Sequence, residues 1–121
     1  MDLMSTILII DDDERFRTQA GELLEADGFV VIGQAVDGAS GLEAAKDLRP
    51  DFALIDIGLP DVEGFDVARE LAIVGPPPLV VLTSSRDARA YGRRLKDVQC
   101  LGFIPKEQIS GAAIRAMVDS E

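Results

Sequence analysis

Residues 54–64 read Leu-Ile-Asp-Ile-Gly-Leu-Pro-Asp-Val-Glu-Gly, an apolar run that ends in a carboxylate, Asp56, and is followed at once by a turn with proline and glycine. A short apolar run bounded by turn residues predicts a buried strand. In open parallel sheets, ligands bind beyond the carboxyl ends of the strands, so Asp56 is expected at the mouth of a site. Taken alone, the segment is explained better by an Asp56 side chain that caps the next helix than by a site residue. The other strand ends must therefore decide between the two roles.

The same pattern recurs along the whole chain. Predicted strands cover residues 7–10, 29–32, 52–55, 79–82 and 101–104. A segment with helically spaced apolar residues follows each strand, and breakers such as Gly28, Pro50 and the proline run 76–78 separate the elements. Five alternations of strand and helix predict an α/β fold, a doubly wound five-stranded parallel sheet with helices on both faces.

Local signals predict where several helices begin. Residues 40–43, Ser-Gly-Leu-Glu, have the capping-box pattern for the second helix. Ser110 can cap the last helix, with Ile109 and Ile114 as its hydrophobic staple. The fourth helix, residues 87–95, has the weakest apolar pattern, and Gly92 lowers its helix propensity. We expect it to be the most mobile helix.

Length and charge limit the classes of function. A chain of 121 residues, 47% hydrophobic, suits one domain, so we expect a single domain over residues 1–121 without an output domain. The 12 basic and 22 acidic residues give a net charge of -10, which predicts no direct binding to nucleic acid or to membranes and attraction of divalent cations. The single cysteine, Cys100, suits a reducing, cytoplasmic location. The absence of histidine excludes Ser-His-Asp catalysis and a phosphohistidine on this chain.

Polar side chains follow four of the predicted strands. Because the carboxyl ends of parallel strands share one edge, we expect a common crevice that contains Asp11, Asp12, Asp56, Thr83 and Lys106. Crowded carboxylates repel one another unless a cation or raised pKa values relieve them. Magnesium commonly binds one or two carboxylates and accepts phosphate oxygens as further ligands, and a lysine and a hydroxyl can hold the other phosphate oxygens.

These segments resemble the receiver domains of two-component response regulators, over residues 7–118. The resemblance rests on residues 7–12 (Ile-Leu-Ile-Ile-Asp-Asp), 54–60 with Gly64, 80–84 (Val-Val-Leu-Thr-Ser) and 102–106 (Gly-Phe-Ile-Pro-Lys). It implies a flavodoxin-like sheet of order 2-1-3-4-5. In many members proline follows the lysine directly, whereas here Pro105 precedes Lys106, which leaves the shape of the last loop open.

The resemblance also implies a role for each residue of the crevice. Asp56 would be the phosphoacceptor. Magnesium would bind Asp12, Asp56 and the backbone carbonyl of Gly58, with Asp11 acting through water. Thr83 and Lys106 would contact the phosphoryl group, and Phe103 would be the switch aromatic.

The function implied is that of a signalling switch rather than an enzyme with turnover. A sensor histidine kinase or a phosphotransfer protein would supply the phosphohistidine, and the phosphorylated domain would change its output surface. A cluster of basic residues in the segment 86–96, with Arg89, Arg93 and Tyr91 as representatives, is the candidate output surface for a downstream protein or a phosphorylation-dependent homodimer. A solvated helix face explains the same charges equally well.

Two other classes of protein share some of these features. A magnesium-dependent aspartyl phosphatase of the haloacid dehalogenase type would use Asp11 and Asp13, which form a D-x-D after the first strand. That family needs a further acidic pair after the lysine, which residues 109–118 lack, and it gives Asp56 no role. A flavin-binding flavodoxin-like module would need a Ser/Thr/Gly-rich phosphate loop after the first strand, which is also missing.

Overall fold

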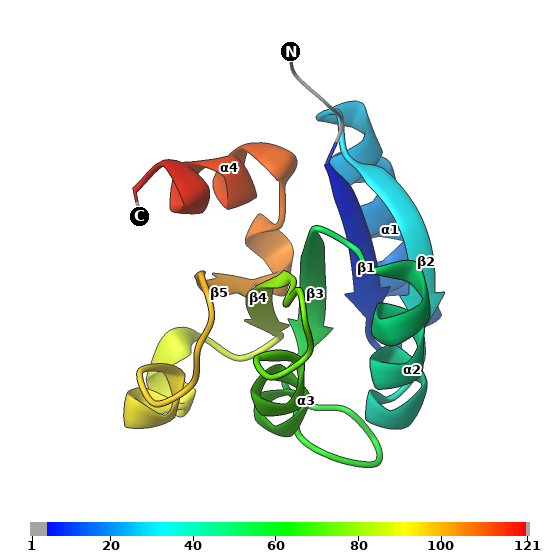
Figure 1. Cartoon of the computed structure of the whole chain (residues 1–121). Coiled ribbons are helices and arrows are strands. Elements are labelled where there is room, and N and C mark those ends of the chain that lie inside the picture. Colours follow the sequence, from blue (N-terminus) through cyan, green and yellow to red (C-terminus); the bar gives the residue numbers. More distant parts are fainter. Residues whose placement is uncertain (1–4, 121) are drawn as a thin grey trace.

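The computed structural model describes residues 5–120, and they form one parallel sheet with helices on both faces (Figure 1). The strands are β1 Thr6–Ile10, β2 Val30–Ala35, β3 Phe52–Asp56, β4 Leu79–Ser84 and β5 Gly102–Pro105. The α-helices are α1 Glu14–Ala26, α2 Gly38–Leu48, α3 Gly64–Leu71 and α4 Gly111–Asp119. Three short 3-10 turns complete the described chain: η1 Ala88–Ala90, η2 Gly92–Leu95 and η3 Lys106–Gln108. The strand order β2-β1-β3-β4-β5, with parallel pairing throughout, confirms the predicted doubly wound sheet.

The central strand β1 shows why the strands are continuously apolar. Its side chains point alternately to the two faces of the sheet. Ile7 and Ile9 pack in the layer that contains residues of α1 and α4, whereas Leu8 and Ile10 pack in the layer that contains residues of α2 and α3. Both faces are covered, so a polar side chain at any of these positions would lie in the core.

Helix starts follow the sequence except at α2. Ser110 caps α4, as expected, and Asp13 caps α1. The predicted capping box of Ser40 with Glu43 is wrong, because α2 begins earlier, at Gly38, with Asp37 as its cap. Asp37 accepts a hydrogen bond from the Ser40 N–H (2.8 Å), so Ser40 is the last residue of the box, at position N3, rather than its first.

The predicted fourth helix is also wrong. Residues 87–95 form the two 3-10 turns η1 and η2 instead of an α-helix. Gly92, the first residue of η2, has a positive φ of 55°, a conformation that interrupts a right-handed helix. No residue of either turn is fully buried, and only Tyr91 and Leu95 of this segment pack against the core, so little apolar surface is available to stabilise a longer helix.

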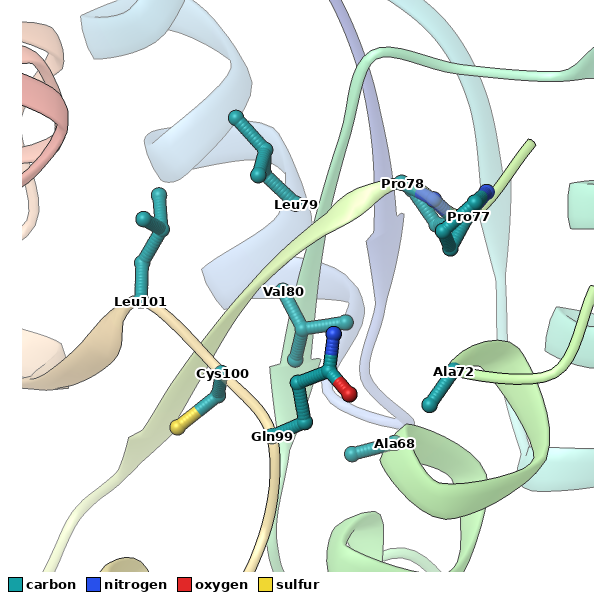
Figure 2. A pocket seen from close by; sticks show the side chains of 9 residues that line it. All are labelled: Ala68, Ala72, Pro77, Pro78, Leu79, Val80, Gln99, Cys100 and Leu101. Carbon is teal, nitrogen blue, oxygen red and sulfur yellow. The ribbon is translucent and has the colours of Figure 1, made fainter. Parts of the chain in front are cut away.

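A small hollow opens near the amino end of β4, where this shortened segment returns to the sheet. Figure 2 shows that three segments of the chain line it: Ala68 and Ala72 at the end of α3, Pro78 and Val80 at the start of β4, and Gln99 and Cys100 before β5. Burial raises the pKa of the Cys100 thiol, which keeps it neutral like the apolar groups around it. The hollow has no carboxylate in its lining and lies away from the strand ends that carry the acidic residues.

None of the helices among residues 5–120 combines the length and apolar character needed to cross a bilayer.

Gly64, the first residue of α3, lies against the end of β3 that carries Asp56. Its N–H donates to the Ile57 carbonyl (2.8 Å). A Cβ at this position would lie 2.5 Å from the Asp56 carbonyl oxygen and 2.8 Å from the Ile57 Cα. Since both neighbours are backbone atoms, only glycine permits this close approach of the helix to the strand end.

We predict that Gly64→Ala lowers the free energy of unfolding by about 2 kcal/mol or more, measured by chemical denaturation. In an open helical position the same change would instead stabilise by about 1 kcal/mol, so the sign is diagnostic. Gly58→Ala is the matched control, because nothing lies within 4 Å of a Cβ at that position. Equal denaturation midpoints for the Gly64→Ala protein and the wild type would contradict the close approach.

Candidate functional site

The strand registers bring the predicted site residues to one edge of the sheet. Asp56 is the last residue of β3, and its register partner is Thr83 in β4. Asp11 directly follows β1 and is held by a hydrogen bond from its N–H to the Ala35 carbonyl of β2 (3.0 Å). Lys106 directly follows β5. All four predicted strand-end positions therefore meet, as the parallel topology requires.

Three carboxylates form the centre of this edge. Asp11, Asp12 and Asp56 each offer one oxygen, and these oxygens all lie within 4.8 Å of one another. Asp11 is completely buried and Asp56 is 6% exposed, whereas Asp12 is exposed. Oxygen ligands at this spacing suit a hard divalent cation such as magnesium.

The environment of Asp56 opposes its negative charge. Burial is the main reason that its pKa is raised above the ordinary value, and the neighbouring charge of Asp11 adds to the effect. Lys106 and a hydrogen bond from the Gly58 N–H to Asp56 Oδ1 (3.2 Å) act in the opposite direction without cancelling it. A cation near this carboxylate would therefore relieve an unfavourable interaction that already exists in the fold.

Among the described ion pairs, Lys106 provides the only positive charge in contact with this cluster, and it contacts Asp11 and Asp56. Its Nζ lies 2.8 Å from Asp11 Oδ2 and 3.6 Å from Asp56 Oδ2. The ammonium also lies over the ring of Phe16, 4.6 Å from the ring centroid, in cation–π geometry. Burial alone would lower the pKa of Lys106, but the hydrogen bond to Asp11 and the charge of Asp56 outweigh it, so the pKa is raised. The lysine is thus held protonated beside Asp56.

The Thr83 hydroxyl is available for a new partner. Thr83 is fully buried, and within residues 5–120 its Oγ1 has no hydrogen-bond partner. An unpaired buried hydroxyl is costly, so it gains by binding a ligand oxygen that enters the site. A shallow opening leads to this region, and its lining includes Asp56, Gly58, Glu63, Ser84, Arg86 and Lys106.

Asp13 takes no part in the cluster. Its side chain accepts hydrogen bonds from the Arg15 N–H (3.0 Å) and the Phe16 N–H (3.4 Å) and so caps α1. Its backbone N–H donates to Asp11 Oδ1 (2.8 Å). The structure therefore separates Asp13 from Asp12, and the phosphatase alternative loses one of its two acidic residues to a helix cap.

The candidate output residues lie in two different environments. Arg89 and Arg93 are exposed on the 3-10 turns. Tyr91 instead points inward, with its hydroxyl 2.6 Å from Ser84 Oγ and its ring 5.8 Å from that of Phe65 and 6.0 Å from that of Phe103 between centroids. Phe103 itself is half-buried in β5. Tyr91 is thus half-buried and links the end of β4 to the turns, and its role in the output surface stays a prediction.

Sequence reasoning missed three residues near the site. Asp61 binds the first turn of α2, Ser84 binds Tyr91, and Glu63 forms an ion pair with Arg94. A Pro-Asp pair within a turn was the available signal for Asp61, but its partners lie more than 20 residues away. Nothing local distinguishes Glu63 or Ser84 from ordinary polar residues.

Comparisons with known proteins agree with this geometry. The family model of the response regulator receiver domain matches residues 7–119. A protein-glutamate methylesterase/protein-glutamine glutaminase of Anaeromyxobacter dehalogenans is 37% identical over 108 residues, which are 88% of this chain and 31% of that protein. The transcriptional regulatory protein PdtaR of Mycobacterium tuberculosis is 29% identical over 124 residues, 95% of this chain and 60% of PdtaR.

Solved structures give the same result. The signal receiver domain of NarL from Mycobacterium tuberculosis has a TM-score of 0.85 and 28% sequence identity, covering 97% of this chain and 98% of that one. The chain spans about half the length of several curated relatives that it matches, transcription regulators among them. The family match, the sheet order and the acidic edge lead to one conclusion: this chain belongs to the response regulator receiver domains of two-component signalling systems.

Proposed function

We propose that Asp56 accepts a phosphoryl group from the phosphohistidine of a sensor histidine kinase or phosphotransfer protein. The observation that carries this proposal is the surroundings of one carboxylate. Asp56 lies in the opening, with a lysine ammonium 3.6 Å from Oδ2 and the unpaired Thr83 hydroxyl on the neighbouring strand. A nucleophile, a cation and a free donor are therefore grouped around the space that a phosphoryl group would occupy.

The proposed step exchanges one bond for another. A carboxylate oxygen of Asp56 forms a bond to phosphorus while the phosphorus–nitrogen bond of the donor breaks. The imidazole nitrogen keeps the electron pair of that bond and takes a proton from solvent. Lys106 and Thr83 contact the phosphoryl oxygens, so this chain contributes mainly through positioning and electrostatics. The chain supplies the acceptor, and its partner supplies the histidine.

The acidic cluster fits a magnesium ion, because three carboxylate oxygens within 4.8 Å of one another form an unfavourable arrangement without a cation. Asp12, Asp56 and the Gly58 carbonyl would hold the ion, with Asp11 acting through water. Bound magnesium supplies neutralisation of the charge that develops during phosphoryl transfer.

Phosphorylation would act as a switch in the proposed function. A phosphoryl group on Asp56 would draw the Thr83 hydroxyl toward it, and Phe103 would turn inward. The exposed side chains of Arg89 and Arg93 would then present a changed surface to a downstream protein or to a second copy of the domain. The proposal is a shift between two states of the domain, biased by the contacts of the new phosphoryl group. Location in the cytoplasm and the absence of direct contact with nucleic acid remain predictions.

The proposed function predicts that magnesium and a small phosphoramidate donor add one phosphoryl group to the protein, and that Asp56→Asn abolishes this addition. Asparagine keeps the shape of the side chain but is a far weaker nucleophile. Intact mass measurement with and without magnesium is the test. Labelling of the Asp56→Asn protein to the wild-type extent would place the acceptor elsewhere.

Asp12 and Asp13, which are adjacent after β1, should have different roles. We predict that Asp12→Ala raises the magnesium concentration for half-maximal labelling by about tenfold or more, because it removes a proposed ligand. Asp13→Ala should leave that concentration unchanged and lower the free energy of unfolding by about 1 kcal/mol, the usual effect of a lost N-cap. Titration of the labelling rate with magnesium measures the first effect and denaturation the second. Equal magnesium requirements in the two variants would reject this division.

The crowding of carboxylates also has a consequence for stability without metal. The pKa of Asp56 is raised in the folded state, so its ionisation destabilises the fold as the pH rises through that folded value. We therefore predict that Asp56→Asn raises the free energy of unfolding at about pH 7 in a chelator by on the order of 1–2 kcal/mol. The gain should shrink as the pH falls toward the ordinary value of 3.8.

Denaturation at several pH values measures this difference. Asp97→Asn is the control, because Asp97 is exposed and its side chain makes no hydrogen bond or ion pair in the described chain. An Asp56→Asn protein less stable than the wild type at neutral pH would show that the other contacts of Asp56 outweigh the repulsion.

A further inference from the structure

A single carboxylate fastens the loop between β3 and α3 to the start of α2. Asp61 Oδ1 accepts a hydrogen bond from the Gly38 N–H (2.8 Å), and Asp61 Oδ2 accepts one from the Ala39 N–H (3.0 Å). The first N–H groups of a helix have no partner within the helix, and the helix dipole favours a negative charge there. Asp61 thereby joins the loop between β3 and α3 to the first turn of α2, more than 20 residues away in the sequence.

This contact is distinct from the capping of α2. The helix already has its own cap, since the Asp37 side chain accepts from the Ser40 N–H (2.8 Å). The loop also packs closely against the helix start, because a Cβ on Gly38 would lie 2.4 Å from Val62 Cγ2. Hydrogen bonds from Gly38 and Ala39 lower the pKa of Asp61, which keeps the carboxylate charged at neutral pH.

The position of Gly58 depends on the hydrogen bond from its own N–H to Asp56 Oδ1 (3.2 Å) and on attachments on either side of it. Gly58 is exposed, and nothing lies within 4 Å of where its Cβ would be, so side-chain packing does not orient this peptide. On one side, the Ile57 N–H donates to the Thr83 carbonyl (2.9 Å). On the other side, Leu59 packs against the core without directional bonds, and Asp61 makes the next hydrogen bonds to another element.

We propose that Asp61 is a positioning residue for the metal site: bound to the first turn of α2, its carboxylate holds the phosphoacceptor loop so that the Gly58 carbonyl faces the acidic cluster. The inference rests on the proposed function, in which that carbonyl is a magnesium ligand. Asp61 itself does not contact the metal or the phosphoryl group. Its effect reaches the site through the short chain segment between Gly58 and Asp61.

The test compares Asp61→Ala with Asp37→Ala in otherwise unchanged protein. Both variants remove an aspartate that binds the first turn of α2, but only Asp61 belongs to the phosphoacceptor loop. Magnesium binding to the unphosphorylated protein, followed by calorimetry, should weaken roughly 3- to 10-fold in Asp61→Ala and remain at the wild-type value in Asp37→Ala. Asp61→Asn keeps one acceptor oxygen and should give an intermediate affinity.

A second measurement reads the loop directly. In metal-free protein, amide hydrogen exchange at Gly58 and Leu59 should accelerate in Asp61→Ala but not in Asp37→Ala, even where the two variants unfold at similar denaturant concentrations. Magnesium affinity equal to the wild type in Asp61→Ala would overturn the inference while leaving phosphorylation of Asp56 untouched. Failure of the wild type to label at Asp56 would instead overturn the proposed function, and the calorimetric comparison would still decide the role of Asp61.

Discussion

Repulsion among Asp11, Asp12 and Asp56 is the constraint around which the rest of the structure is arranged. Two like charges about 4 Å apart repel by roughly 4 kcal/mol at an effective dielectric near 20. Full burial of an aliphatic side chain contributes about 1.5–3 kcal/mol. The continuously buried strands β1 and β3 can therefore carry this repulsion at their ends, and Lys106, 2.8 Å from Asp11, offsets part of it. The repulsion that remains favours the binding of a cation between the carboxylates.

Hydrogen bonds fasten the loops at this edge to the neighbouring strands and helices. Ile57 is bonded to Thr83 on one side and to Gly64 on the other, and Asp61 reaches α2. Each attachment belongs to the folded chain itself. In the proposed function, placement of the reacting groups before the phosphoryl donor arrives would reduce the reorganisation required during transfer. At Gly64 the backbone of α3 comes so close to the end of β3 that there is no room for a side chain.

The sequence was sufficient for the sheet and for most of the crevice, for a physical reason. Strands covered on both faces must be apolar throughout, so β1 and β3 are recognisable without knowledge of their neighbours. Parallel topology then places Asp56 and Lys106 at one edge wherever the helices lie. The start of α2 could not be decided locally, because Asp37 with Ser40 and Ser40 with Glu43 are overlapping capping patterns. Tertiary contacts chose the first pattern, since Asp61 binds the N–H groups of Gly38 and Ala39.

The segment 86–96 shows where such local reasoning ends. Its weak pattern was visible in the sequence, but its 3-10 geometry depends on contacts with distant residues. The Tyr91 hydroxyl bonds Ser84, and Arg94 pairs with Glu63 while lying over the Phe65 ring, 4.4 Å from the centroid. With no buried residue of its own, η1 or η2 has low local stability and depends on these few contacts.

Those contacts all end beside the opening to Asp56. Ser84 follows Thr83 directly in β4, and both Ser84 and Glu63 line the opening. In the proposed switch, a movement of the Thr83 backbone toward the phosphoryl group would move Ser84 as well, and this would either break the hydrogen bond between Ser84 and Tyr91 or carry Tyr91 along. The rings of Phe65 and Phe103, which are close to that of Tyr91, would have to repack in either case. In the proposed function, phosphorylation of Asp56 would thus reach the turns η1 and η2 through Ser84 and Tyr91, without contact between the turns and the phosphoryl group itself.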